Sequence, residues 1–373
     1  MVVRQVARQT GERLLGSRAQ LLKRVCFVGF DGMVEESFRV IDHRGSLDQY
    51  TVLSSIEQFV VRLQKKAREQ AASAFELIEG RPRMSGSAPW FSSALGALGT
   101  QVHFLGACGK PECRHPVFAE VERRAKVYPV ALPAFERVLE FGDGRLSLGD
   151  YRSLEEITWE LLEARVGKPL LQELWASAHL AAFLNWSRLP HLSLLWKRLL
   201  SELCHLSGSP RKLLFFDLGN LLHPTDADLA AALKILAEFE TCHDVVLSLN
   251  ALESEAVARV LHVPRRDLDI TGAASLAAAI REKAGISTVV IHCPRFAAVA
   301  DGTTEEGLEA PHTAKPKTVS QAGDHFNAGF CAGRLLGWKL LHSLQLGVAC
   351  AGFYVRHAAS PTREQLVRFL RTL

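Results

Sequence analysis

Short apolar runs alternate with segments of helical period along most of the chain. This alternation is typical of an α/β fold, in which a mostly parallel sheet is covered by helices on both faces. The predicted strands span residues 24–30, 75–78, 102–105, 180–184, 213–218, 245–249 and 288–292. The predicted helices span residues 56–72, 91–98, 192–203, 227–238 and 254–261, and three more follow one another from residue 324 to the end. A sheet of this kind binds ligands at the carboxyl ends of its strands, so we expect the functional residues there.

Two segments interrupt this pattern. Residues 37–52 and 138–148 read as short, exposed β-segments, and the turn Gly142-Asp143-Gly144 in the second suits a hairpin. Short hairpins bury too little apolar surface to be stable alone. On these observations they are surface hairpins without an assigned role.

The first 23 residues form a basic segment ahead of the first predicted strand. Its charged side chains are Arg4, Arg8, Arg13, Arg18 and Lys23, with Glu12 as the single acid. We expect an amphipathic surface helix that precedes a domain of residues 24–373. An organelle transit peptide has a similar composition and is the alternative. The segment lacks the hydrophobic region of a secretory signal peptide, so secretion is not expected.

Composition narrows the class of protein. Of the 373 residues, 48% are apolar and 23% are charged, which is typical of a globular protein with a sizeable core. The net charge of +4 is too small to indicate a nucleic-acid partner, and no run of roughly eighteen apolar residues predicts a membrane span. The eight cysteines are scattered among apolar segments, which predicts reduced, buried thiols and a cytoplasmic location. Cys108, Cys113 and His115 do not have the spacing of a standard zinc site.

The most informative stretch is the turn and helix start at residues 320–330. A polar, glycine-containing turn leads into a helix of small and apolar residues, with Asp324 at the junction. The N–H groups of Ala322, Gly323 and Asp324 have no intrahelical partners and lie at the positive end of the helix dipole, so they suit an anion. A carboxylate there is placed to take a proton from a hydroxyl that attacks a bound phosphate. The alternative is that Asp324 only caps the helix.

Three separated motifs, in the same order, resemble those of the ribokinase-like (PfkB) carbohydrate kinases. Residues 323–330 are similar to the second family signature, residues 250–253 (N-A-L-E) to the N-x-x-E motif, and residues 28–36 to the first strand and its acids. The resemblance implies a ribokinase-like fold and ATP-dependent phosphorylation of a hydroxymethyl group of a sugar or sugar-containing small molecule. Asp324 would be the general base, with Ala322–Asp324 as the anion hole. The two β-segments would form a small lid over the sugar, which in the family is often shared across a homodimer.

The same resemblance assigns roles to further residues. Asn250 and Glu253 would organise Mg²⁺ and the phosphates, although the pair also fits a plain capping box at a helix start. His292 and Gly352 would lie at the nucleotide, in the region of residues 290–298 and of a C-terminal helix. The implied contacts to the acceptor sugar are Asp31, Glu35, Ser87, Asn185 and Asn327.

Several positions depart from the family pattern. Gln321 stands where the family has the first glycine of its anion-hole turn, and its side chain would either crowd the phosphate or supply a further donor. Ser87 replaces an asparagine, and the glycine expected after the strand that ends at His292 is absent. These departures favour the alternative function, a catalytically impaired sugar or nucleotide sensor. The retained Asp324 and the N-x-x-E pair favour a kinase. A dinucleotide-binding oxidoreductase is least favoured, because no G-x-G-x-x-G follows the first strand.

Overall fold

The computed structural model describes residues 2–204, 211–221 and 224–373. Its centre is a nine-stranded sheet made of β1 Val25–Phe30, β6 Gln101–Gly106, β9 Lys126–Pro129, β12 Leu180–Phe183, β13 Leu213–Asp217, β14 Asp244–Asn250, β15 Thr288–His292, β16 Phe296–Ala300 and β17 Glu305–Glu309. The strand order is β17-β16-β15-β14-β13-β12-β1-β6-β9. The seven strands from β15 to β9 run parallel, and β16 and β17 continue the sheet antiparallel.

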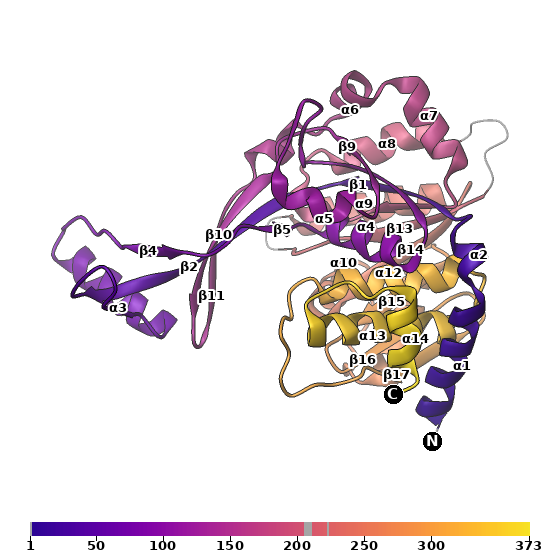
Figure 1. The fold of residues 1–373 in the computed structure, drawn as a ribbon. Coiled ribbons are helices and arrows are strands. Elements are labelled where there is room, and N and C mark those ends of the chain that lie inside the picture. Colours follow the sequence, from indigo (N-terminus) through magenta and orange to yellow (C-terminus); the bar gives the residue numbers. More distant parts are fainter. Residues whose placement is uncertain (1, 205–210, 222–223) are drawn as a thin grey trace.

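Helices cover both faces of this sheet (Figure 1). One face carries α6 Trp159–Val166, α7 Lys168–Ser177, α8 Leu192–Glu202, α9 Asp226–Phe239, α10 Ala251–Val260 and α11 Ile270–Ala284. The other carries α1 Val2–Gly16, α2 Arg18–Leu21, α4 Ser87–Leu98, α5 Ala119–Glu122, α12 Ala322–Leu335, α13 Leu340–His357 and α14 Arg363–Leu370. Alternate strand residues point to opposite faces, so Phe27 belongs to one core and Val28 to the other. The predicted α/β architecture is confirmed.

A second, six-stranded sheet projects from the main body (Figure 1). Its strands are β2 Met33–Arg44, β3 Tyr50–Val52, β4 Leu77–Glu79, β5 Arg83–Ser85, β10 Ala134–Phe141 and β11 Gly144–Asp150, and α3 Ile56–Arg68 packs beside it. Val40, Leu53, Phe59 and Leu139 form its own small core. We call these strands and α3 the lid sheet. The remaining short elements are the strand pair β7 Gly109–Lys110 and β8 Cys113–Arg114, and the 3-10 turns Pro116–Phe118, Arg152–Glu156 and Trp186–Arg188.

One predicted strand belongs to a different sheet from the one expected. Residues 75–78 were expected in the central sheet, but β4 pairs with β2 in the lid sheet, with Phe38 opposite Glu79. The chain at this point has already left the main body, because β2 and α3 precede it in the projecting part. The prediction of a strand at this position was therefore right, but the sheet to which it was assigned was wrong.

The N-terminal basic segment forms α1, which packs along α13 and α14. The Thr10 hydroxyl lies 2.9 Å from Nδ1 of His342, and the Arg363 guanidinium donates to the carbonyl oxygens of Leu14 and Leu15. The basic side chains at Arg4 and the other predicted positions of α1 face outward. The two ends of the chain thus stabilise one another.

Four cysteines depart from the prediction of reduced, buried thiols: Cys113 is exposed, Cys293 is half-buried, and Cys204 and Cys242 are not reduced. Cys204 and Cys242 form a disulfide that joins the ends of α8 and α9. The two residues are 38 positions apart, and only the packing of the two helices brings them together. Cys26, Cys108, Cys331 and Cys350 are buried free thiols, as expected. No helix in the described parts of the chain is long and apolar enough to cross a membrane.

Candidate active site

The residues predicted from the sequence converge on one edge of the central sheet. Asp31, Asp217 and Asn250 lie at or just beyond the carboxyl ends of β1, β13 and β14, and Glu253 follows in the first turn of α10. The N-terminus of α12 brings Asp324 to the same place. The carboxylates of Asp31, Asp217, Glu253 and Asp324 are near enough for their charges to raise one another's pKa values. Segments from across the chain therefore meet at the edge where α/β sheets bind ligands.

Asp324 is the third residue of α12 and is buried, with 9% of its surface exposed. Its burial raises its pKa well above the usual value, and the charges of Asp217 and Asp31 raise it further. A hydrogen bond with the Ser87 side chain acts in the opposite direction. The N-cap of α12 is Gln321, so the alternative in which Asp324 only caps the helix is wrong. A carboxylate with a raised pKa accepts a proton more readily, as a general base must.

Asp217 and Glu253 are the other two acids with raised pKa values. Burial raises the pKa of Asp217 to about 6, against hydrogen bonds from Asn327 and from the Gly219 N–H, which lower it. Burial and the charge of Asp217 hold the pKa of Glu253 well above its usual value. Neither has a lysine or arginine partner within salt-bridge distance among the described ion pairs. The site therefore concentrates negative charge in a poorly solvated place.

Asn250 and Glu253 form a complete capping box at the start of α10. The Glu253 N–H donates to Asn250 Oδ1 at 3.0 Å, and the Asn250 N–H donates to Glu253 Oε2 at 2.9 Å. The Asn250 amide also donates to Glu253 Oε1 at 2.7 Å. The capping box holds the Glu253 carboxylate at the ligand edge, so the structural and the functional roles are compatible.

Asp31 is fully buried and caps the N-terminus of α4. Its two oxygens accept the backbone N–H groups of Ser87 at 2.9 Å and Ala88 at 2.7 Å, and Oδ2 also accepts the Asn185 amide at 2.8 Å. Asn185 is held at φ 60° in the loop that follows β12, beyond Leu184. These contacts fix three of the predicted acceptor residues, Asp31, Ser87 and Asn185, in one group beside Asp324.

Asn327 occupies a different position from the one expected. It was predicted to contact the acceptor, but it is fully buried one turn into α12. Its amide donates to Asp217 Oδ2 at 2.9 Å, and its oxygen accepts the Ser248 hydroxyl at 2.7 Å. Asn327 therefore joins α12 to β13 and β14 and orients Asp217.

Glu35 lies on β2 of the lid sheet, with 8% of its side chain exposed. Its Oε1 accepts hydrogen bonds from Arg83 and Arg145, each at 2.5 Å. No hydrogen bond to Oε2 occurs among the described residues. One carboxylate oxygen is thus anchored and the other is available to a ligand hydroxyl.

Gln321 precedes the anion hole in the left-handed region, at φ 60°. Its carbonyl oxygen lies 2.8 Å from Nδ1 of His325, and the Tyr354 hydroxyl lies 3.5 Å from its Oε1. Burial lowers the pKa of His325 to about 3, so the ring is neutral; Nδ1–H donates to Gln321 and Nε2 accepts the Ser360 hydroxyl. The His325 ring stacks on Tyr354 at 3.7 Å. The Gln321 side chain is therefore directed toward α13.

A cavity of about 560 Å³ adjoins the N-terminus of α12. Asn250, His292, Gly323 and Gly352 contribute to its lining, so it extends from the predicted nucleotide residues to the anion hole. A Cβ on Gly352 would come within 2.5 Å of Pro311, so only glycine fits there. The His292 ring packs on Phe326, 5.0 Å between centroids, and burial lowers its pKa to about 4. The cavity is large enough for a nucleotide.

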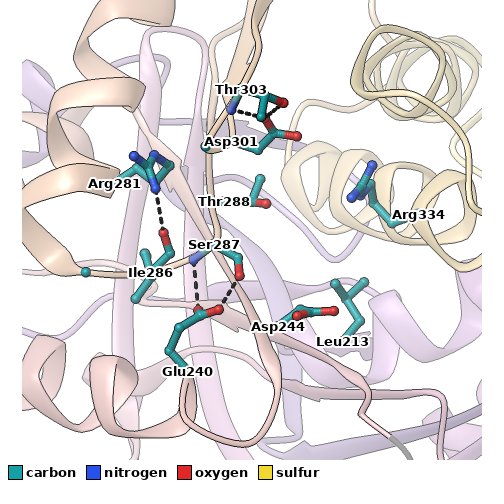
Figure 2. Close-up of a pocket in the computed structure, with 12 residues that line it drawn as sticks. Leu213, Glu240, Asp244, Arg281, Ile286, Ser287, Thr288, Asp301, Thr303 and Arg334 are labelled. Carbon is teal, nitrogen blue, oxygen red and sulfur yellow. Dashed lines mark hydrogen bonds between the residues drawn. The ribbon is translucent and has the colours of Figure 1, made fainter.

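A second cavity, of about 550 Å³, lies at the opposite edge of the sheet (Figure 2). It is lined by the starts of β13, β14 and β15, by the β16–β17 turn, and by Arg334 near the end of α12. Two of its acids already accept hydrogen bonds from nearby residues. Glu240 accepts the N–H and the hydroxyl of Ser287, and Asp301 accepts the N–H of Thr303 (Figure 2). Its position at the amino ends of the parallel strands separates it from the candidate active site.

Sequence reasoning missed the roles of several residues at the site. Asp217 ends a predicted strand but belongs to none of the motifs, and the contacts of Arg83, Arg145 and Tyr354 were not foreseen. Their partners are distant in sequence, as with Arg145 and Glu35, which are 110 positions apart. The one signal in the sequence was the β-segment predicted at residues 138–148, which overlaps β10 and β11 and contains Arg145.

The parallel sheet, the acid at the head of α12 and the projecting lid sheet define a ribokinase-like carbohydrate kinase. The structure is similar to a ribokinase from Arabidopsis thaliana complexed with ribose and ATP, with a TM-score of 0.62, 14% identity and coverage of 93% of this chain and 98% of that one. A ribokinase from Cryptococcus neoformans in complex with ADP matches with a TM-score of 0.63, 14% identity and coverage of 92% and 99%. These two similarities show the fold.

The family model of prokaryotic ketohexokinase matches residues 6–372, and the chain belongs to this family. A curated relative, the ketohexokinase of Haloferax volcanii, is 29% identical over 346 residues, which cover 93% of this chain and 90% of the relative. The protein is accordingly a carbohydrate kinase, a phosphotransferase with an alcohol group as acceptor. The family match begins within α1, so the N-terminal helix is part of what this family shares.

Proposed function

We propose that this protein transfers the γ-phosphate of ATP to a hydroxymethyl group of a sugar, and that the sugar is a ketohexose. The observation that carries the proposal is the position of Asp324, buried at the start of α12 beside a cavity that Ala322 and Gly323 line. Phosphoryl transfer needs an oriented hydroxyl, a base and donors around the transferring group, and this site offers each of them. The curated relative named ketohexokinase supports a ketohexose as the acceptor.

Asp324 would act as the general base. Its carboxylate takes the proton of the acceptor hydroxyl while the hydroxyl oxygen forms a bond to the γ-phosphorus, and the bond from that phosphorus to the β,γ-bridging oxygen breaks to release ADP. The N–H groups of Ala322, Gly323 and Asp324 would hold the phosphoryl oxygens, because they have no intrahelical partners and lie at the positive end of α12. The fixed position of these donors stabilises the charge that develops during transfer.

Asp217 and Glu253 would hold Mg²⁺ through its bound water. Burial and the charges of neighbouring acids raise their pKa values, and no lysine or arginine pairs with them among the described ion pairs, which fits a divalent cation with oxygen ligands. When bound, the ion neutralises charge on the phosphates. Asn250 keeps Glu253 oriented through the capping box, and Asn327 does the same for Asp217.

The acceptor sugar would bind between the main body and the lid sheet. Asp31, Asn185 and Ser87 form one side, and the available Oε2 of Glu35 the other. The nucleotide would occupy the cavity next to His292 and Gly352. These positions put the sugar and the nucleotide on opposite sides of Asp324.

A coupled ADP-release assay over ketohexoses, aldohexoses and pentoses tests the proposal, with mass spectrometry of the products. The expected result is Mg²⁺-dependent ADP release that is largest with a ketohexose and a monophosphorylated product. If none of the sugars in the panel leads to ADP release, but ATP and Mg²⁺ still raise the thermal midpoint, the protein would instead be a sensor. Against that alternative, the Gln321 side chain is directed toward Tyr354 and does not fill the anion hole.

The lid sheet would also mediate a homodimer. Most of the large hydrophobic side chains exposed among the described residues lie on it or on its β2–β3 turn, namely Leu47, Tyr50, Val60, Val61, Leu63, Leu77, Phe135 and Leu148. A projecting sheet with an apolar surface is stabilised when a second copy covers it. The proposed dimer therefore buries this face.

A further inference from the structure

Arg145 connects the lid sheet to the turn that begins the anion hole. It lies on β11, and its two terminal nitrogens reach different partners. Nη2 donates to Glu35 Oε1 at 2.5 Å, and Nη1 donates to the Ser320 hydroxyl at 3.0 Å. Ser320 directly precedes Gln321 and the donors of α12. One planar guanidinium therefore spans from a predicted sugar ligand to the predicted phosphate site.

We propose that Arg145 is a positioning residue that couples binding of the acceptor sugar to the order of the anion hole. The inference rests on the function proposed above. A sugar hydroxyl that donates to Glu35 Oε2 fixes the Glu35 carboxylate, and Glu35 Oε1 then fixes Arg145 against Ser320. The coupling depends on three hydrogen bonds: from the sugar to Glu35, from Arg145 to Glu35 and from Arg145 to Ser320. It requires no large movement.

Without Arg145, the turn would be anchored only on the side that faces α13. On the α13 side, His325 and Tyr354 hold the carbonyl and side chain of Gln321. On the lid side, the one hydrogen bond to Ser320 among the described residues is that of Arg145. Gln321 is in the left-handed region, which is unfavourable for a residue with a side chain. A turn of this kind keeps its conformation when both sides are held.

The strength of the hydrogen bond between Arg145 and Ser320 depends on whether water reaches it. The Arg145 side chain is 37% exposed, so its hydrogen bonds compete with water while the site is empty. A sugar between the lid sheet and the main body excludes that water and strengthens the electrostatic contacts that remain. The contact between Arg145 and Ser320 therefore becomes stronger when the acceptor is present.

Arg83 is a matched control within the same cluster. It donates to the same oxygen of Glu35, also at 2.5 Å, and both arginines lie within 4 Å of Glu140. Its other contact is the Ser37 hydroxyl at 3.1 Å, and it has no hydrogen bond to Ser320. Loss of Arg83 removes a similar charge from Glu35 and leaves the connection to the anion hole in place.

The test measures how strongly the sugar tightens nucleotide binding. Calorimetry gives the dissociation constant of a non-hydrolysable ATP analogue with Mg²⁺, with and without the best ketohexose, for wild type, Arg145→Gln, Arg83→Gln and Ser320→Ala. The ratio of interest is the dissociation constant without the sugar divided by that with the sugar. For wild type we expect this ratio to be at least about 5, the lower end of ordinary coupling between sites. Arg145→Gln and Ser320→Ala reduce the ratio to below about twofold, and the double variant loses no more than either single one.

Arg83→Gln keeps the wild-type ratio even where it weakens sugar binding itself. A wild-type ratio of one, an unchanged ratio in Arg145→Gln, or an equal loss in Arg83→Gln would each overturn the inference. These outcomes are separate from the fate of the proposed function, which depends on whether wild type phosphorylates the sugar at all.

Discussion

The charge on Asp217 makes the stability of this protein depend on pH. Burial raises the pKa of its carboxyl from 3.8, the value for a solvated aspartate, to about 6 in the folded chain. Because the folded pKa is the higher one, the folded state binds the proton more tightly than the unfolded state. The stabilisation by this proton is fully present below pH 3.8 and is lost as pH rises through about 6.

Asp217→Asn therefore stabilises the fold above neutral pH. The variant has no charge to desolvate, and the gain is at most about 3 kcal/mol, from roughly 1.4 kcal/mol per pKa unit. Asn327 can rotate its amide to accept from the new Asn, with its nitrogen donating to Ser248, so the buried hydrogen bonds are retained. Urea unfolding at pH 5 and pH 8, without Mg²⁺, measures the effect. Equal pH dependence in the variant and wild type would contradict this account of the site.

The position of Glu35 shows why side-chain roles at the site were harder to predict than residue identities. Its place after the first strand was visible in the sequence, but its two arginine partners come from β5 and β11, which meet only in the folded lid sheet. Asn327 was misassigned for the same reason, since its partners Asp217 and Ser248 lie on neighbouring strands. Motif spacing along one helix or strand is local, whereas these contacts are tertiary.

At the scale of elements, the lid sheet is the part whose behaviour depends on a second copy. Three of its exposed apolar side chains, Val60, Val61 and Leu63, lie on α3, and Val61 is 57% exposed. Val61→Asp places a charge in the proposed interface, where it would lose its hydration. We expect the variant to have half the molar mass of wild type in light scattering at micromolar concentration. A wild-type monomer, or an unchanged dimer in the variant, would contradict the interface. Leu194→Asp is the matched control, because Leu194 is 58% exposed on α8, outside the lid sheet, and the substitution introduces the same charge.

Helices and strands with a clear apolar pattern in the sequence were predicted well. Those whose bounds depend on contacts with distant residues were not. β15 was predicted to its exact bounds and α8 to within one residue, because each has a clean apolar pattern. α4 begins at Ser87, four residues earlier than expected. The reason is that the Asp31 carboxylate, which lies just after β1, accepts hydrogen bonds from the first N–H groups of the helix. β16 and β17 were missed, since one is alanine-rich and the other acidic, and both owe their conformation to pairing with β15.

At the scale of the whole molecule, the first helix and the last two helices form one packed unit. Leu14 is fully buried, and Arg363 of α14 bonds to the carbonyl oxygens of Leu14 and Leu15. A Cβ on Gly11 would lie 3.3 Å from Leu370, so α1 and α14 pack closely. α13 in turn lines the nucleotide cavity through Gly352, so the N-terminal helix supports the wall of the site.

Leu14→Ala is expected to lower the free energy of unfolding by about 2–4 kcal/mol, the usual range for removing a buried leucine side chain. Leu15→Ala is the matched control, because its side chain is 52% exposed, and it should change stability by less than about 0.5 kcal/mol. Chemical denaturation of both variants provides the measurement. Equal stability of the two variants would show that α1 does not contribute to the fold.

The most direct test of the account is the rate of sugar phosphorylation by Asp324→Asn. The substitution removes the base and keeps the size of the side chain at the head of α12. We expect kcat to fall by about 10²–10⁴-fold, the range that general base catalysis contributes, with the nucleotide dissociation constant within about threefold of wild type. The thermal midpoint should not fall, because the variant loses a buried charge whose pKa is raised. A variant that folds, binds nucleotide and phosphorylates the ketohexose at the wild-type rate would contradict the assignment of Asp324 as the base.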